Sequence, residues 1–369
     1  MAVYIKAVLE LTLRNGRFSA TFARTTCIRK ESTKASKLVY SEYGEASKVV
    51  RQESESLRIQ KDHEITVRML AAPVNPSDIN TIQGVYPIKP KLPSVPGNEG
   101  VGEVISVGNN VKNFTPGDRV IPRYNAWGTW RTHAVCEATE MMKVSQNIGI
   151  IEAATLSVNP CTAYRMLQDF VQLSSGDTIM QNGANSAAGQ YVIQLCRVWG
   201  INSVNVVRNR DNIEELKCYL ADLGATHVLI EEELRTTELF KAQGVQKPKL
   251  LLNCVGGKNA QDCLRHLFKG GVMVTYGGMS RQPVTIPTSA FIFKDINAHG
   301  FWITQWNKDH DRSPEQEEML QDITCMYEAD LLKPPIHKLV PFNNYQEALE
   351  NTINPKGFSG VKYILDFQC

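Results

Sequence analysis

The feature that most constrains the fold is a change in sequence pattern near Asn159. From about Lys37 to that point, short runs of alternating apolar and polar residues are broken by closely spaced prolines and glycines, which is typical of a β-rich, barrel-like domain. Beyond it, apolar runs alternate with helix-length amphipathic segments, which predicts a parallel, doubly wound sheet. The strands of that sheet are expected at residues 177–181, 203–207, 227–230, 250–254, 272–276 and 296–302.

The pattern changes again after about Gln305, where it becomes irregular. A short strand-like run at residues 361–367 closes the chain and is more similar to the first part than to the second. A chain of 369 residues also exceeds what one ordinary hydrophobic core supports. We therefore predict two domains, the first of which is interrupted by the second and completed by the tail.

Composition excludes several classes of protein. Hydrophobic residues make up 43% and charged residues 21%, as in ordinary globular chains. No apolar run is long enough for a membrane-spanning helix, so no membrane span is expected. The net charge of +2 gives no support for a nucleic-acid surface, and no nucleic-acid partner is expected.

Most of the positive charge lies in residues 1–36, where seven bases and two acids give a net charge of +5. This segment is also rich in Ser and Thr and lacks the apolar core of a secretory signal. Such a composition is typical of an organelle transit peptide. The alternative is a disordered basic tail that stays attached.

A loop of small residues at 182–189 follows a predicted strand and opens a predicted helix. A dinucleotide-binding fold holds its phosphates at such a point, because small residues let the backbone approach and the helix offers free N–H groups. The loop is not a full GxGxxG motif, so a tight packing turn remains the alternative. The nucleotide contacts expected here are Asn185, Ser186, Ala187 and Ala188.

The end of the second predicted strand indicates which cofactor binds. NAD enzymes place an acidic residue there for the ribose hydroxyls. This chain instead has Arg208, Asn209 and Arg210, and two guanidinium groups suit a 2′-phosphate. NADPH is therefore predicted, with a solvated charged turn as the alternative. Glycines at the end of a later strand predict further ligand contacts at Tyr276, Gly277, Gly278 and Met279, with a simple β-turn as the alternative.

Nothing in the sequence predicts a metal site. The nine cysteines include no CxxC pair, and the seven histidines are scattered. No Cys–His grouping has the spacing of zinc ligands. We expect free thiols and no bound metal.

Four short motifs together resemble the medium-chain dehydrogenase/reductase superfamily. They are Asn-Pro-Ser-Asp at 75–78, Gly-Asn-Glu-Gly at 97–100, Pro-Gly-Asp-Arg-Val at 116–120 and Gly-Thr-Trp at 128–130. Asn98 stands where the zinc-dependent branch has histidine, and the four-cysteine lobe is missing. The chain is thus similar to the zinc-free, quinone-oxidoreductase-like branch.

Within that branch, the sequence resembles the mitochondrial enoyl-thioester reductases of fatty acid synthesis. The matching blocks include residues 70–80, 82–86, 128–132, 159–167, 252–257, 274–279 and 300–302. The resemblance implies an α/β fold in which a GroES-like catalytic domain is interrupted by a Rossmann domain. It also implies a mitochondrial localisation and a homodimer. The expected division is a transit peptide at 1–36, the first part of the catalytic domain at 37–158, the NADPH-binding domain at 159–304 and the C-terminal catalytic part at 305–369.

The resemblance further implies a reaction. NADPH gives a hydride to C3 of a trans-2-enoyl thioester, either enoyl-CoA or enoyl-acyl-carrier-protein, and the proposed acid for C2 matches Tyr86. A phenol stays protonated near neutral pH and can donate to an enolate; without the resemblance, Tyr86 reads as a surface aromatic. Further cofactor contacts implied by the resemblance are Asn159, Phe301, Trp302, Ile303, Thr304 and Lys362. For Phe301 and Trp302 the alternative is a pair of core aromatics at a strand end.

Two alternatives to this function remain open from the sequence. One is a zinc-free NADPH quinone oxidoreductase of the same branch. The other is a non-catalytic module that binds NADPH.

Overall fold

The computed structural model describes residues 32–368 with gaps at 60, 242–243 and 354–359. The expected transit peptide lies almost wholly outside the described residues. The first strand, β1 (Thr33–Tyr40), begins four residues before the expected start at Lys37. It pairs antiparallel with β2 (Val50–Leu57), which aligns Thr33 with Leu57 and Ser36 with Ser54. Thr33, Lys34 and Ser36 are polar and Ala35 is small, so residues 33–36 gave little apolar signal, although pairing with β2 includes them in the strand and Ala35 is buried.

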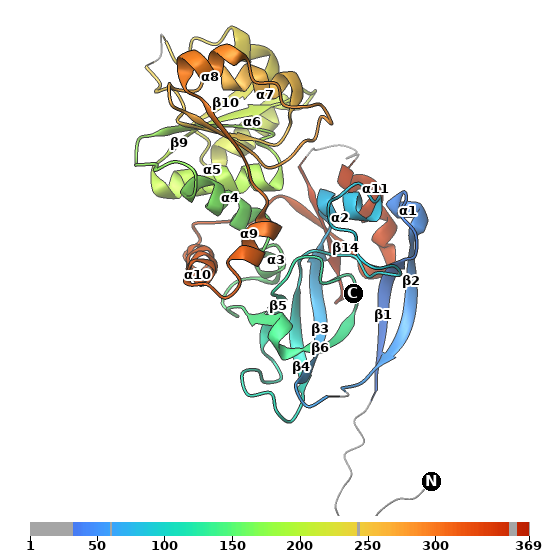
Figure 1. Ribbon diagram of the computed structural model, residues 1–369. Coiled ribbons are helices and arrows are strands. Elements are labelled where there is room, and N and C mark those ends of the chain that lie inside the picture. The colour runs from blue at the N-terminus through green and yellow to red at the C-terminus, as the bar shows by residue number, and fades with distance from the viewer. Residues whose placement is uncertain (1–31, 60, 242–243, 354–359, 369) are drawn as a thin grey trace, which may run out of the picture.

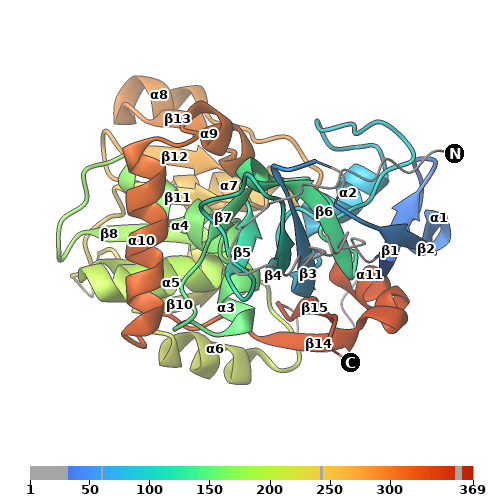
Figure 2. The same ribbon diagram turned by 90° about the horizontal axis from the view of Figure 1, so that it is seen from below.

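The first lobe is built on a seven-stranded sheet with the order β14-β15-β3-β4-β5-β7, with β6 paired to β3 (Figures 1 and 2). The tail supplies two of these strands, and β15 pairs antiparallel with β3, with Ile364 opposite Pro73. The C-terminal segment therefore returns to complete the first lobe, as the sequence predicted. The strands are β3 (Glu64–Pro73), β4 (Val101–Val107), β5 (Arg119–Pro122), β6 (His133–Glu137), β7 (Met141–Lys143), β14 (His337–Pro341) and β15 (Lys362–Asp366).

The second lobe holds a six-stranded parallel sheet with the order β10-β9-β8-β11-β12-β13. The chain runs outward from β8 in one direction and then from β11 in the other, which is the doubly wound arrangement with its switch point between β8 and β11. The strands are β8 (Thr178–Asn182), β9 (Asn202–Val207), β10 (His227–Ile230), β11 (Leu250–Asn253), β12 (Val272–Thr275) and β13 (Asn297–Gly300).

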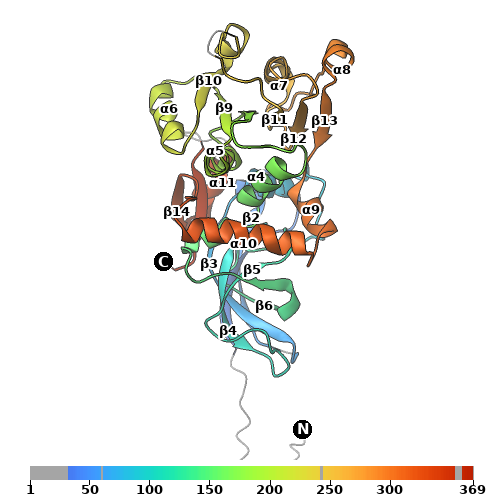
Figure 3. The ribbon, with the colours of Figure 1, turned by 90° about the vertical axis from the view of Figure 1, so that its left-hand side faces the viewer.

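Helices cover both faces of the parallel sheet (Figure 3). On one face α4 (Asn159–Gln168), α5 (Ala187–Trp199) and α6 (Ile213–Asp222) pack against the strands. On the other face lie α7 (Gly257–Leu264) and α8 (Thr288–Lys294). The four central strands β9, β8, β11 and β12 are buried on both sides, whereas the edge strand β10 is half-buried and the edge strand β13 is exposed.

One hydrophobic cluster spans the two lobes. Leu70, Val101 and Ile364 of the first lobe belong to the same buried cluster as Ile179 and Leu250 of the second. The helices α9 (Ile303–Asp309) and α10 (Pro314–Glu328) lie at this junction, and α10 crosses it in Figure 3. A continuous core fixes how the lobes face each other.

The remaining elements are short. They are α1 (Ala46–Val49), α2 (Pro76–Ile82), α3 (Ile150–Ala154), α11 (Tyr345–Ile353) and the 3₁₀ turns η1 (Ala138–Glu140), η2 (Glu231–Arg235) and η3 (Phe342–Asn344). Within the described part of the chain, no helix combines the length and apolar character that crossing a bilayer requires.

Candidate functional site

The candidate site lies where the carboxyl ends of the parallel strands meet the first lobe. In doubly wound sheets, ligands bind outside these strand ends, at the switch point. The segments that follow β8, β9, β12 and β13 carry most of the predicted contacts. The first lobe contributes α2, the Tyr86 segment after it and Lys362 of β15.

The loop after β8 has the backbone that a phosphate-binding turn needs. Gly183 adopts a φ of 60°, and a Cβ there would lie 2.6 Å from the Sγ atom of Cys254. A Cβ at Gly189 would lie 2.5 Å from the carbonyl oxygen of Ala184, so α5 packs directly on the loop. These two positions therefore require glycine.

Ser186 caps α5, because its Oγ accepts the N–H of Gly189 at 3.2 Å. Ala187 and Ala188 form the first turn of the helix, where N–H groups have no partner within the helix. Anions bind well at such a helix start. The loop therefore fits the pyrophosphate of a dinucleotide, although Asn185 uses its carbonyl oxygen to accept from Gln190 Nε2.

Arg208, Asn209 and Arg210 directly follow β9, as predicted. The N–H of Arg210 donates to the side chain of Asn209 at 2.9 Å, and its Nε donates to the carbonyl oxygen of Arg208 at 3.2 Å. Among the described residues, neither guanidinium has a carboxylate within 4.0 Å. Partial burial and the charge of Arg208 lower the pKa of Arg210. A 2′-phosphate would relieve this repulsion between the two cations.

The segment after β12 runs beside the end of β11. Tyr276 and Met279 donate their N–H groups to the carbonyl oxygens of Asn253 and Cys254, both at 2.9 Å. A Cβ at Gly277 would contact Cys254 at 3.1 Å, whereas one at Gly278 would meet no atom within 4 Å. Gly278 and Met279, which is 57% exposed, thus face open space at the strand ends. The Tyr276 hydroxyl is buried, and burial raises its pKa.

The segment after β13 divides into a half-buried and a fully buried part. Phe301 packs edge-on against Phe170, with ring centroids 5.9 Å apart. Trp302 reaches across to the first lobe. Ile303 and Thr304 begin α9 and are both buried.

Tyr86 lies at the crossing between the lobes. Trp302 donates its Nε1–H to the Tyr86 hydroxyl oxygen at 2.8 Å, and the two rings meet edge to face at 5.9 Å. Burial raises the pKa of the Tyr86 hydroxyl above its ordinary value. Tyr86 therefore keeps its proton at neutral pH, and because its oxygen accepts from Trp302, its own O–H is left to donate elsewhere.

The short helix α2 holds the Tyr86 segment in place. Asn75 and Asp78 form a capping box at its start, in which the Asn75 N–H donates to Asp78 Oδ2 at 2.8 Å. The helix ends at Ile82, and Val85 donates its N–H to the carbonyl oxygen of Asn80 at 3.0 Å. Tyr86 thus follows directly from an anchored turn.

Next to this helix lies a buried polar cluster, which the sequence did not predict as a unit. Lys362 is buried and donates its ammonium to Asn75 Oδ1, and Asn159 Nδ2 approaches the same oxygen at 3.5 Å. Asn75 Nδ2 donates to Glu99 Oε1 at 2.9 Å. The predicted contacts Asn159 and Lys362 are therefore brought together by two residues, Asn75 and Glu99, that the sequence singled out only as family motifs.

Burial dominates the electrostatics of this cluster. It raises the pKa of Asp78 to about 7 and raises the pKa of Glu99, while it lowers the pKa of Lys362. The opposite charges of these groups partly offset each shift. The two carboxyl groups therefore bind a proton more readily, and Lys362 releases one more readily, than exposed groups of the same kinds would.

The described residues contain no group of three or more His, Cys, Asp or Glu side chains that could hold a metal ion. Asn98 instead donates its Nδ2 to Ser77 Oγ at 3.0 Å. The seven described cysteines carry free thiols, five of them buried.

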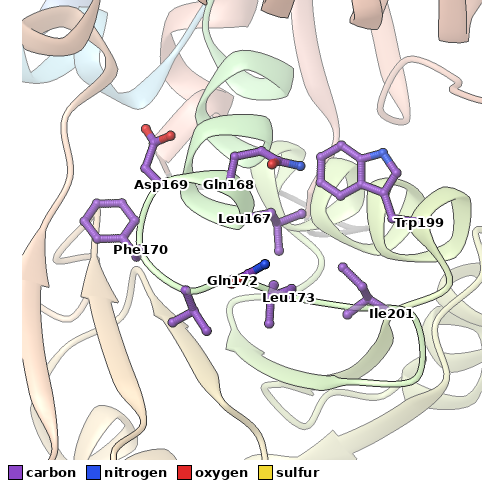
Figure 4. Close-up of a pocket in the computed structure, with 9 residues that line it drawn as sticks. Leu167, Gln168, Asp169, Phe170, Gln172, Leu173, Trp199 and Ile201 are labelled. Carbon is purple, nitrogen blue, oxygen red and sulfur yellow. The ribbon is translucent and has the colours of Figure 1, made fainter.

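Two hollows lie away from the predicted contacts. One of about 360 Å³ sits at the end of α4 and is lined by residues 167–173, Trp199 and Ile201 (Figure 4). Another of about 720 Å³ lies between the β5 and β7 strands and α10. Neither includes any residue predicted to bind the cofactor, so the site is built on the strand ends rather than on these hollows.

Comparison with known proteins assigns the family. A family model described as alcohol dehydrogenase GroES-like domain matches residues 61–157, and one described as zinc-binding dehydrogenase matches residues 187–322. The mitochondrial enoyl-[acyl-carrier-protein] reductase of Rattus norvegicus is 46% identical over 368 residues, which cover 99% of this chain and 96% of that protein. This chain belongs to the mitochondrial enoyl-[acyl-carrier-protein] reductases. The enzyme of the same name from Caenorhabditis elegans is 48% identical over 312 residues, which cover 84% of this chain and 89% of that protein.

Solved structures agree with this reductase family. The structure of the Etr1p/NADP/crotonyl-CoA complex is 36% identical, with a TM-score of 0.84, and the match covers 90% of this chain and all of that one. Membership confirms the predicted family, the α/β fold with a GroES-like and a Rossmann-like unit, and the prediction of a reductase. It also confirms the predicted mitochondrial localisation.

Proposed function

We propose that this reductase uses NADPH to reduce trans-2-enoyl thioesters, carried on coenzyme A or acyl carrier protein, with Tyr86 as the proton donor. The observation that carries the proposal is the Tyr86 hydroxyl at the strand-end crevice, with its oxygen bonded to Trp302 and its proton free to donate. The related Etr1p was solved with NADP and crotonyl-CoA, which supports this cofactor and this substrate class.

Different segments of the chain would bind different parts of the cofactor. The N–H groups of Ala187 and Ala188 would hold the pyrophosphate, and Arg208 and Arg210 would hold the 2′-phosphate. The remaining contacts would come from Asn185, Ser186, Asn209 and residues 276–279 of the second lobe, and from Asn159, residues 301–304 and Lys362 at the junction with the first lobe. When bound, NADPH supplies the hydride that C3 of the substrate receives.

Tyr86 completes the reaction on the other side of the double bond. Hydride addition at C3 builds negative charge on the thioester oxygen, and a donor in a low-dielectric site stabilises that charge strongly. The phenol O–H serves as this donor and then protonates C2. Burial keeps the phenol protonated, so the acid is available throughout the neutral pH range.

The same assignment includes a homodimer. The related Etr1p was solved as an Etr1p/Etr2p heterodimer. In this chain, β13 is the edge of the parallel sheet and every one of its residues is exposed. Beside it, α8 exposes Phe291, Ile292 and Phe293, the last to 72%. An exposed edge strand next to an apolar surface favours pairing with a second copy.

The test of the proposed function is NADPH oxidation by the protein lacking residues 1–31. Crotonyl-CoA, a quinone and no acceptor are compared, each with NADPH and with NADH. The proposal expects rapid oxidation only with NADPH and crotonyl-CoA. Oxidation driven by the quinone alone would favour the quinone oxidoreductase instead, and NADPH binding without any oxidation would favour the non-catalytic module.

A further inference from the structure

Asn75 is a buried carboxamide whose orientation is set from both ends. Its Nδ2 donates to Glu99 Oε1 at 2.9 Å, and its Oδ1 accepts from the Lys362 ammonium and faces Asn159 Nδ2 at 3.5 Å. An acceptor on one side and donors on the other allow only one of the two amide orientations. Asn75 therefore presents a fixed oxygen to Asn159.

Glu99 reaches the same target by a second route. Its other oxygen, Oε2, accepts the N–H of Val158 at 3.0 Å, and Val158 immediately precedes Asn159 at the start of α4. A carboxylate at a helix start is favoured by the helix dipole. Thr129 Oγ1 in turn donates to the Glu99 carbonyl oxygen at 2.7 Å, which fixes the backbone of Glu99. Glu99 thus holds both the side-chain partner of Asn159 and the peptide before it.

Stability alone does not explain this arrangement. Glu99, Asp78 and Lys362 are all buried, and burying charges costs about as much as their mutual attraction returns. Well-packed apolar residues of similar size would serve a purely structural role as well. What the polar cluster provides is direction, because hydrogen bonds set angles that apolar contacts leave loose.

The cluster also joins the two halves of the site. Asn75 caps α2, which leads to Tyr86, and Glu99 anchors the start of α4, which carries Asn159. Lys362 comes from β15 of the returning tail. One set of hydrogen bonds thus spans the segment of the acid, a predicted cofactor contact and the C-terminal strand.

We propose that Asn75 and Glu99, oriented by Lys362, are positioning residues that align Asn159 with the cofactor. This inference rests on the proposed function, in which Asn159 contacts NADPH. Neither Asn75 nor Glu99 needs to touch substrate or cofactor, because both act through Asn159.

A double-mutant cycle between Glu99→Gln and Asn159→Ala tests the inference. Glutamine keeps the volume of Glu99 but has only one acceptor oxygen. It therefore cannot accept from both Asn75 Nδ2 and the Val158 N–H, which bind different oxygens of Glu99. The readout is the single-turnover rate of NADPH oxidation by crotonyl-CoA, with both saturating, together with the dissociation constant for NADPH. We expect Glu99→Gln to slow the rate by about tenfold or more, since small misplacements of reacting groups are costly. We expect the double variant to be within about twofold of Asn159→Ala alone, because the two changes act on one contact.

Gln194→Leu is the matched control. Gln194 is also a buried carboxamide, and it binds the backbone N–H and carbonyl of Lys333 at 2.8 and 3.1 Å. This variant should lose stability in urea but keep the wild-type rate. If Glu99→Gln does not fold, Asn75→Ser replaces it in the same cycle, because serine is too short to join Glu99 to Asn159.

The outcomes separate this inference from the proposed function. A wild-type rate for the folded Glu99→Gln variant, or rate losses that simply multiply in the double variant, would overturn the positioning role. Absence of crotonyl-CoA-dependent oxidation by the wild type would overturn the proposed function instead. In that case the same cycle is evaluated from the NADPH dissociation constants. Non-additive effects of the two substitutions on NADPH affinity would support the alignment of Asn159, and additive effects would reject it.

Discussion

Asp78 is a carboxyl group whose surroundings change its protonation in the neutral pH range. Burial raises its pKa to about 7, although the Asn75 N–H and the Lys362 charge act in the opposite direction. The unfolded chain holds the same group near its ordinary pKa of about 4. The folded protein therefore binds a proton there that the unfolded chain has already released.

The sign of the resulting pH dependence follows from linkage. Stability from a raised folded pKa is fully present below about pH 4 and is lost as the pH rises to about 7. The wild type should lose about 1 kcal/mol of unfolding free energy between pH 6 and pH 8 that Asp78→Asn does not lose. Urea denaturation at the two pH values measures this difference, with the exposed Asp211→Asn as control. Equal losses in the wild type and Asp78→Asn would contradict this assignment.

Arg208 and Arg210 should determine the choice between NADPH and NADH. Replacing both with alanine removes charge-assisted bonds worth about 1.5–3 kcal/mol each when well formed. Because both arginines are partly solvated, we expect the NADPH dissociation constant to rise about tenfold or more and that of NADH to change little. Fluorescence titration measures both constants, and Arg58→Ala, an exposed arginine of the first lobe, is the control. An equal loss of affinity for the two nucleotides would argue against a 2′-phosphate site.

At the scale of elements, the join between β8 and α5 depends on one helical glycine. Replacing glycine with alanine inside a helix ordinarily stabilises it by up to about 1 kcal/mol. At Gly189 the new Cβ would lie 2.5 Å from the Ala184 carbonyl oxygen, and this backbone atom cannot rotate away. Gly189→Ala should therefore destabilise the protein by about 1–3 kcal/mol and weaken NADPH binding.

Gly278→Ala is the matched control for this prediction, since a Cβ there meets nothing within 4 Å. Its unfolding free energy in urea should stay close to that of the wild type. Greater stability of Gly189→Ala than of the wild type would mean that α5 can move away from the loop.

Local sequence signals predicted the second lobe well. The central strands β11 and β12 are short, mainly apolar runs, and the nucleotide loop and the two arginines follow strands directly, so neighbours in sequence are also neighbours in the site. The start of β1 was placed too late because three of residues 33–36 are polar, and their place in the strand comes from pairing with β2.

The polar cluster at the junction could not be predicted in the same way. Asn75 lies 24 residues from Glu99 and 287 residues from Lys362, and only the fold brings them together. One local signal was present: asparagine followed three residues later by aspartate is a capping pattern, which the structure confirms at α2. Tyr86 has no such signal, and the family resemblance alone singled it out.

At the scale of the whole molecule, the buried cluster that spans both lobes fixes how they face each other. Trp302 of the second lobe and Tyr86 of the first meet at 2.8 Å across the junction of the lobes. The acid is therefore positioned by both lobes, and the tail strand β15 closes the first lobe beside it.

The proposed dimer gives a prediction at the same scale. Ile292→Glu places a charge on the apolar surface of α8, where Ile292 is exposed in the single chain. We expect the variant to sediment as a monomer in analytical ultracentrifugation, while the wild type sediments as a dimer. Leu339→Glu, at an exposed leucine on β14, is the control and should remain dimeric. A wild-type mass for Ile292→Glu would exclude this surface.

The most direct test of the proposed mechanism is the turnover of Tyr86→Phe with NADPH and crotonyl-CoA. Phenylalanine keeps the ring beside Trp302 and removes only the hydroxyl. We predict that kcat falls by about 10²–10⁴-fold while the NADPH dissociation constant stays near that of the wild type. Tyr43→Phe, which removes another hydroxyl close to this segment, bonded to the Pro90 carbonyl oxygen, should keep full activity. A Tyr86→Phe enzyme with wild-type kcat would contradict the assignment of Tyr86 as the acid.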